Sequence, residues 1–136
     1  MKYKNKINLI LVIIWMALIF VMSSFNSTES SNQSGFVVNL IINIFNIKNL
    51  ELLSLIIRKT AHFTEYLILG LLVSNLIKNY NKKTYIAILI CILYAISDEF
   101  HQFFVPGRSC QLMDMIIDSI GSILGIFTLK KIKHKK

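Results

Sequence analysis

Histidine, acidic and arginine side chains gather in two short stretches of an otherwise apolar chain. The first stretch, RKTAHFTEY, covers residues 58–66, and the second, SDEFHQ, covers residues 97–102. An ionisable side chain inside a bilayer is costly unless it faces a polar interior, pairs with another charge or reaches the head groups. Imidazole and carboxylate groups suit proton transfer, and guanidinium groups suit the binding of phosphate or carboxylate. We therefore expect these residues to form a functional site.

The first stretch predicts a helix with one polar face. Arg58, His62 and Glu65 stand at positions i, i+4 and i+7, which project from the same side of a helix. Lys59 turns about 100° away from them, so it can extend toward the head groups.

The second stretch predicts a similar face on another helix. Asp98, His101 and Gln102 share one side of it. Glu99 and His101 differ by roughly 200° on a regular helix, so both can enter one site only where the helix end is irregular.

A third polar face follows the only proline and the Arg108 that comes after it. Asp114, Asp118, Gly121 and Gly125 occupy positions i, i+4, i+7 and i+11 of a predicted helix. The glycines would let a neighbouring helix approach closely, with the two carboxylates on the same side.

Three predicted helices carry a carboxylate at a similar depth. Glu65, Asp98 and Asp118 each lie roughly six to nine residues, or about 9 to 13 Å, from the outer end of their helix. These carboxylates can form a single polar chamber, open to the outside, with His62, His101, Arg58 and Arg108. A purely structural alternative stays open. In it, Arg58 and Lys59 anchor the helix at the membrane–water interface, and the acidic residues only pair with arginines to join helices.

Two kinds of function fit such a chamber. In the first, Arg58 and Arg108 hold the anionic head group of a lipid or glycolipid, and the carboxylates orient the arginines. In the second, the protein is an intramembrane hydrolase or transferase in which His101 or His62 acts as base or nucleophile and Glu65 or Asp98 orients it. The arginines would then stabilise a developing anion.

A metal ion is a variant of the enzyme hypothesis. His62, His101 and nearby carboxylates could hold a divalent cation, but their spacing matches no standard zinc signature, so metal and cofactor stay open. Transport is a weaker option, because four spans without an evident inverted repeat leave little room for alternating access unless a homo-oligomer forms.

The composition places these helices in a membrane. The chain has 136 residues, of which 54% are hydrophobic and 16% charged, and its mean hydropathy is +0.60. These values exclude an ordinary soluble domain. We expect an all-α polytopic protein forming a single domain over residues 1–136, with four transmembrane helices at about 7–22, 58–77, 84–105 and 112–129. The first span could instead be the apolar core of a signal peptide.

The segment 23–57 is expected to stay on the outer face. It begins with polar residues and then becomes apolar, with Asn39, Asn43 and Asn46 at helical spacing. This pattern predicts an amphipathic helix lying on the outer leaflet or re-entering it. A fifth span is the competing interpretation.

Basic residues predict the orientation. Three lie at the N-terminus, three in the turn 78–83 and five in the tail from residue 130, and all should be cytoplasmic. The protein is therefore expected in the bacterial cytoplasmic membrane with both termini in the cytoplasm. The formal charge of +8 then reflects topology and anionic lipids, so no nucleic-acid partner is expected. Cys91 and Cys110 lie 19 positions apart and suggest neither a disulfide nor a structural zinc site.

With these motifs in order, the chain resembles the VanZ-like family of small bacterial membrane proteins. The resemblance covers almost the whole chain and rests on RKTAHFTEY, on YAISDEFHQFFVPGRSCQLMDMIIDSIGSILG at residues 94–125, and on an upstream SS at residues 23–24. It adds Tyr66 to the candidate residues. The candidates for catalysis are His62, Glu65, Asp98, Glu99 and His101, and those for binding are Arg58, Lys59, Tyr66, Gln102, Arg108, Asp114 and Asp118.

The resemblance also implies a function in the cell envelope. The family's namesake confers low-level resistance to the glycopeptide antibiotic teicoplanin without altering the peptidoglycan precursor. The expected partners are membrane lipids and a lipid-linked envelope precursor or glycolipid. Whether the protein is an enzyme stays open between the two hypotheses above.

Overall fold

The described part of the chain is entirely α-helical, as expected. A computed structural model describes residues 2–26, 35, 50–77 and 80–134. Four long helices run through it: α1 (Lys2–Ser23), α3 (Leu50–Leu76), α4 (Tyr80–Gln102) and α5 (Leu112–His134). The amphipathic segment predicted around Asn39, Asn43 and Asn46 lies outside the described residues.

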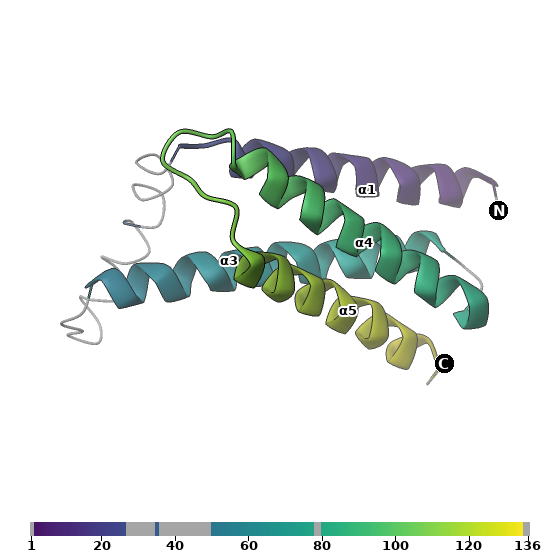
Figure 1. Ribbon diagram of the computed structural model, residues 1–136. Coiled ribbons are helices and arrows are strands. Elements are labelled where there is room, and N and C mark those ends of the chain that lie inside the picture. The colour runs from purple at the N-terminus through teal and green to yellow at the C-terminus, as the bar shows by residue number, and fades with distance from the viewer. Residues whose placement is uncertain (1, 27–34, 36–49, 78–79, 135–136) are drawn as a thin grey trace.

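The four helices form a bundle in which successive helices run in opposite directions (Figure 1). The start of α1, the end of α3, the start of α4 and the end of α5 lie at one end of the bundle. The opposite end holds the connection from α4 to α5, and there α3 extends beyond its neighbours (Figure 1). The three lysine-rich segments of the sequence therefore belong to a single end, as one membrane orientation requires.

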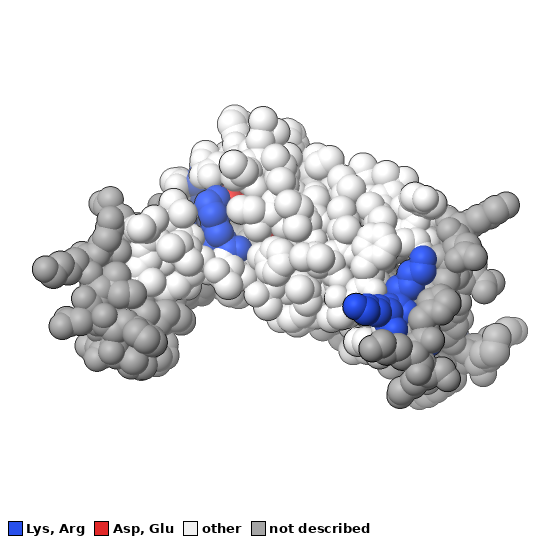
Figure 2. Space-filling model, turned by 90° about the horizontal axis from the view of Figure 1, so that it is seen from below, with Lys and Arg blue, Asp and Glu red and all other residues white. Residues whose placement is uncertain are grey.

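Three helices are long and apolar enough to cross a membrane, which makes this a multi-pass membrane protein. They are Asn5–Ser23, Thr84–Gln102 and Leu112–Lys133, with mean hydropathies of 2.3, 1.4 and 1.7. Figure 2 shows two separate groups of Lys and Arg with uncharged surface between them. Exposed leucine, isoleucine and phenylalanine side chains occur along α1, α4 and α5. The predicted crossing by α3 at residues 58–77 stays a prediction, since the polar stretch lowers its hydropathy.

Helix α4 ends earlier than the sequence suggested. Its last residue is Gln102, whereas the predicted span continued to Val105. The amide of Phe104 donates to the His101 carbonyl at 3.0 Å and that of Val105 to the Gln102 carbonyl at 3.0 Å, which is the tighter pattern of a closing turn. Gly107 then adopts a φ of 76°, and this conformation turns the chain back toward α5.

Helices α3 and α5 share the most extensive interface between described helices, and glycines make it close. A Cβ added to Gly121 would lie 2.6 Å from the Phe63 carbonyl oxygen, and one added to Gly125 would lie 2.1 Å from that of Leu67. From the other side, a Cβ on Gly70 would lie 2.1 Å from the Ser122 carbonyl oxygen. The predicted packing role of Gly121 and Gly125 is confirmed.

Helix α1 is held to the bundle by hydrogen bonds to backbone carbonyls. The Trp15 indole donates to the Glu65 carbonyl of α3 at 2.9 Å, and the Tyr94 hydroxyl of α4 donates to the Met16 carbonyl of α1 at 2.6 Å. Near the lysine-rich end, the Asn8 side-chain amide donates to the Asn75 backbone carbonyl at 3.4 Å and accepts a hydrogen bond from the Asn75 side chain at 3.3 Å. These bonds fix α1 against α3 and α4 inside an apolar surrounding.

We predict that Gly125→Ala destabilises the bundle. The new methyl group would overlap the Leu67 carbonyl oxygen, and since that oxygen belongs to a helix backbone, the two helices must separate. The expected loss is about 1 to 3 kcal/mol, measured as a lower melting temperature of the detergent-purified protein. Gly35→Ala is the matched control, because nothing lies within 4 Å of its added Cβ. Equal melting temperatures for the two variants would contradict the close contact.

We also predict that a membrane-impermeant maleimide labels Cys110 on intact cells and leaves Cys91 unlabelled. Cys110 is exposed in the connection between α4 and α5, and Cys91 is buried in the bundle. Gel-shift labelling measures this, with Cys110→Ser as the unlabelled control. Labelling of Cys110 only after the cells are permeabilised would place this connection in the cytoplasm and reverse the predicted orientation.

Candidate functional site

A cavity of about 170 Å³ opens at the end of the bundle where α4 connects to α5. Since a water molecule occupies about 30 Å³ in the liquid, the cavity has room for several waters or a phosphate-sized group. Its walls come from the first half of α3, the end of α4, the connection 103–111 and the start of α5. The lining residues are Leu55, Arg58, Lys59, His62, Gln102, Gly107, Arg108, Ser109, Gln111 and Asp114.

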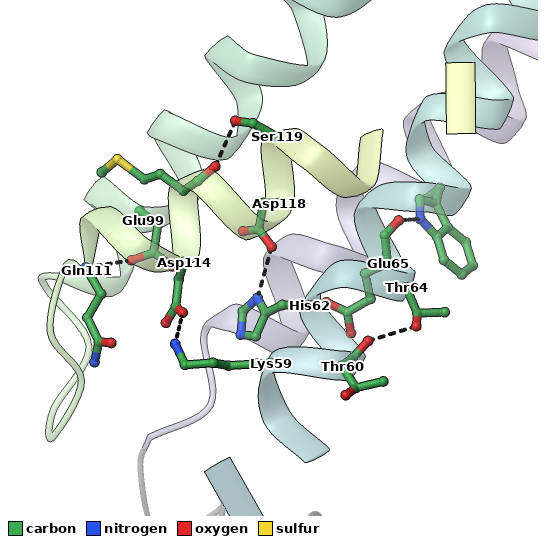
Figure 3. A network of polar contacts seen from close by, with 12 residues as sticks. Lys59, Thr60, His62, Thr64, Glu65, Glu99, Gln111, Asp114, Asp118 and Ser119 are labelled. Carbon is green, nitrogen blue, oxygen red and sulfur yellow. Dashed lines mark hydrogen bonds and ion pairs between the residues drawn. The ribbon is translucent and has the colours of Figure 1, made fainter. Parts of the chain in front are cut away.

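Three cationic side chains line the cavity in different environments. Lys59 donates to the Asp114 carboxylate and forms an ion pair with it (Figure 3). It does not extend away toward the head groups, because the close contact of α3 with α5 brings Asp114 within its reach. Arg58 is exposed and Arg108 is half-buried. Burial, reinforced by the charge of nearby Arg58, lowers the pKa of Arg108 from its usual value, although a guanidinium group stays charged at any physiological pH.

Below the cavity, three ionisable groups from three helices converge. Asp118 of α5 is fully buried, and Asp98 of α4 is 2% exposed. The His62 Nδ1 of α3 lies 3.8 Å from an Asp118 carboxylate oxygen (Figure 3). One donor atom from each of the three residues lies within 4.8 Å of the others, so they could hold a metal ion. The sequence had placed Glu65, Asp98 and Asp118 at one level; the two aspartates meet there with His62, and Glu65 is not part of this group.

Glu99 and His101 do not share a site. Glu99 is buried and accepts a hydrogen bond from the Gln111 backbone amide at 3.0 Å (Figure 3), so its carboxylate lies at the N-terminus of α5. The His101 ring instead packs against Phe20 of α1, with ring centroids 4.3 Å apart. Helix α4 remains regular through these residues, and the angle of roughly 200° therefore separates their side chains.

Glu65 and Tyr66 lie deeper along α3 and do not line the cavity. The Glu65 side chain is half-buried, and its backbone carbonyl accepts the Trp15 hydrogen bond. Tyr66 is fully buried, and its ring centroid lies 6.2 Å from that of Tyr94.

Of the residues that the sequence suggested, the cavity brings together Arg58, Lys59, His62, Gln102, Arg108 and Asp114. Sequence reasoning missed the contributions of Leu55, Ser109 and Gln111. The Pro106–Gly107 pair was the available signal for the last two, because a tight turn there returns the following residues over the end of α4. Leu55 is an ordinary apolar residue, so the sequence carried no signal that it lines the cavity.

The geometry divides the site into a cationic cavity and an acidic floor. Guanidinium groups with neighbouring amides suit the binding of phosphate or carboxylate. His62 Nδ1 lies 3.8 Å from Asp118, which is longer than a hydrogen bond, so the carboxylate would orient the imidazole for proton transfer only after the two side chains move closer.

Comparison with known families and proteins places the chain in a family. No curated protein and no solved structure shows a significant match to it. The family model described as VanZ/LLP1 matches residues 8–133, which include most of α1, all of α3 and α4, α5 up to its last residue, the cavity and the converging histidine and aspartates. The chain therefore belongs to the VanZ/LLP1 family.

Proposed function

We propose that this protein binds the anionic head group of an envelope lipid, glycolipid or lipid-linked precursor in the cavity at the end of the bundle. The observation that carries the proposal is the presence of Arg58 and Arg108 in one cavity of about 170 Å³. Guanidinium groups bind phosphate and carboxylate through paired, parallel hydrogen bonds, and the geometry of such bonds adds specificity to charge attraction.

The cationic side chains of the cavity favour an anion. Lys59 is neutralised by Asp114. Among the described residues, neither Arg58 nor Arg108 forms an ion pair, and the two guanidinium groups repel each other, although the nearby acids Asp98, Glu99 and Glu65 offset part of this repulsion at Arg108. An anion held between them would remove this repulsion. Gln102 and Gln111 add side-chain amides to the same walls.

The position of the cavity favours a ligand that belongs to the membrane. It lies at one end of an apolar bundle, away from the lysine-rich end (Figures 1 and 2). By the positive-inside rule, the lysine-rich end and both termini are cytoplasmic, so the cavity faces outward at head-group level. Occupation of this site would alter how amphiphilic antibiotics meet the cell surface, in keeping with the teicoplanin resistance of the family's namesake.

We predict that Arg108→Lys weakens head-group binding although the positive charge is kept. Lysine is a point charge and cannot make the paired contacts of a guanidinium group. The expected loss is about tenfold in affinity, or about 1.4 kcal/mol. Titration of a short-chain anionic phospholipid into the detergent-purified protein measures this, and the teicoplanin tolerance of cells that express each variant should fall in parallel.

Lys131→Arg is the control for this experiment, because it exchanges one cation for another at the opposite end of the bundle. It should bind lipid as the parent does. If Arg108→Lys also binds as the parent does, the bidentate model is wrong.

The contact of His62 with Asp118 favours a second candidate, an intramembrane hydrolase or transferase acting on a lipid-linked substrate. Asp118 would orient the imidazole, and His62 would act as base at the edge of the cavity that it lines. This differs from the sequence-based hypothesis, in which Glu65 or Asp98 had that orienting role.

Replacing His62 by Gln tests this second candidate. The variant keeps a polar side chain of similar length, so expression should survive, but turnover of a labelled lipid-linked envelope substrate should fall by about 100-fold or more. Purified parent protein that leaves the labelled lipid unchanged, with and without divalent metals, would exclude the hydrolase.

A further inference from the structure

The floor of the cavity contains buried polar atoms that the head-group proposal does not use. Asp98 is 2% exposed and Asp118 is fully buried. Both oxygens of each carboxylate lack a hydrogen-bond partner among the described residues, as does the Nδ1 of His62. Buried polar groups in proteins are nearly always hydrogen-bonded, so five such atoms in one place require an explanation.

Neighbouring groups do not satisfy these carboxylates. The Tyr66 hydroxyl lies close enough to Asp98 to interact with it, yet neither the hydroxyl nor either Asp98 oxygen has a full hydrogen-bond partner among the described residues. Lys59, the amine nearest the floor on α3, is already engaged by Asp114 (Figure 3). Two carboxylates that approach each other in a low-dielectric interior need a positive charge or a proton between them.

We propose that His62, Asp98 and Asp118 bind a divalent transition-metal ion such as Zn²⁺ or Mn²⁺. Imidazole nitrogen and carboxylate oxygen are ligands that these ions accept. A divalent ion would neutralise two aspartates at once and would use the Nδ1 and carboxylate atoms that otherwise lack partners. The two charges of the cation match the two charges of the acids, so a neutral His62 completes a balanced site.

The distances fit a shared ion after small side-chain rotations. Two ligand atoms on a tetrahedral zinc ion lie about 3.4 Å apart, given metal–ligand bonds of about 2.1 Å. The observed separation of His62 Nδ1 from Asp118 is 3.8 Å, and the widest separation among the three donor atoms is within 4.8 Å. Binding would therefore bring the donor atoms closer by about 0.4 Å for the His62–Asp118 pair and by up to about 1.4 Å for the widest pair, a range that side-chain rotation covers.

The three ligands come from three helices, so the ion would join α3, α4 and α5. Three protein ligands leave a fourth tetrahedral position for water or another oxygen. His62 also lines the cavity, which gives an ion a route to the site from the outer end of the bundle. The site is therefore separate from the arginines but adjoins the volume that they line.

Metal uptake by the full-length protein tests the proposal. Protein purified in detergent is stripped with EDTA, dialysed against Zn²⁺ or Mn²⁺ in separate arms, washed, and analysed by inductively coupled plasma mass spectrometry. We expect about one equivalent of metal per chain and a higher melting temperature in the loaded protein, since binding to the folded state stabilises it.

Loss of any ligand should weaken the uptake. His62→Ala, Asp98→Asn and Asp118→Asn should each reduce metal affinity by at least about tenfold. Glu51→Gln is the control, because it removes a carboxylate charge at the start of α3, eleven residues before His62, and leaves the Lys59–Asp114 ion pair in place. Parent-level uptake by Asp98→Asn and Asp118→Asn would overturn the proposal.

A spectroscopic measurement on the parent chain covers the case in which these variants fail to fold. When Cu²⁺ or Mn²⁺ binds to the stripped protein, pulsed electron paramagnetic resonance should show nitrogen nuclear modulation from the imidazole ring of a coordinated histidine. Stripped parent protein that takes up no metal, or bound metal without this nitrogen signal, would overturn the proposal.

The metal site and the head-group site can fail separately. Lipid titration in EDTA reports on the arginines without metal, and metal uptake in lipid-free detergent reports on the floor without lipid. If the protein binds lipid but takes up no metal, the metal site is wrong and the proposed function still stands.

Discussion

The close contact of α3 with α5 is the constraint on which the rest of the site depends. Glycines at the interface bring helix backbones so near that an added methyl group would meet a carbonyl oxygen at 2.1 Å. Only at this separation can the short aspartate side chains of α5 reach the residues of α3 that they face. The contacts of Lys59 with Asp114 and of His62 with Asp118 therefore depend on the short distance between the two helix backbones as well as on charge.

The fold and much of the site could be predicted because both depend on helical periodicity. One face of α5 was expected to carry Asp114, Asp118, Gly121 and Gly125, and this face does pack on α3. The two aspartates contact α3 through their side chains and the two glycines through their backbone. The all-α architecture followed from hydropathy. Periodicity within a single helix was sufficient for these features, since each needs only the position of a residue around its own axis.

The remainder depends on how helices rotate against each other, which no single helix specifies. His101 shared a predicted face with Asp98, yet it packs against Phe20 of α1. Lys59 was expected to extend toward the head groups, and its actual partner lies 55 residues away on α5. The end of α4 at Gln102 depends on the turn that Gly107 closes, and Leu55 lines the cavity only because α3 continues past its neighbours.

The anchoring of α1 through main-chain acceptors separates helix attachment from side-chain chemistry. Trp15 bonds to the carbonyl of Glu65, and Tyr94 bonds to the carbonyl of Met16. Every amino acid offers the same carbonyl, so mutations at positions 65 and 16 leave the acceptor of each bond in place. The carboxyl group of Glu65 is thereby independent of helix attachment, so a substitution at this position changes the chemistry of the bundle interior without removing the acceptor that holds α1.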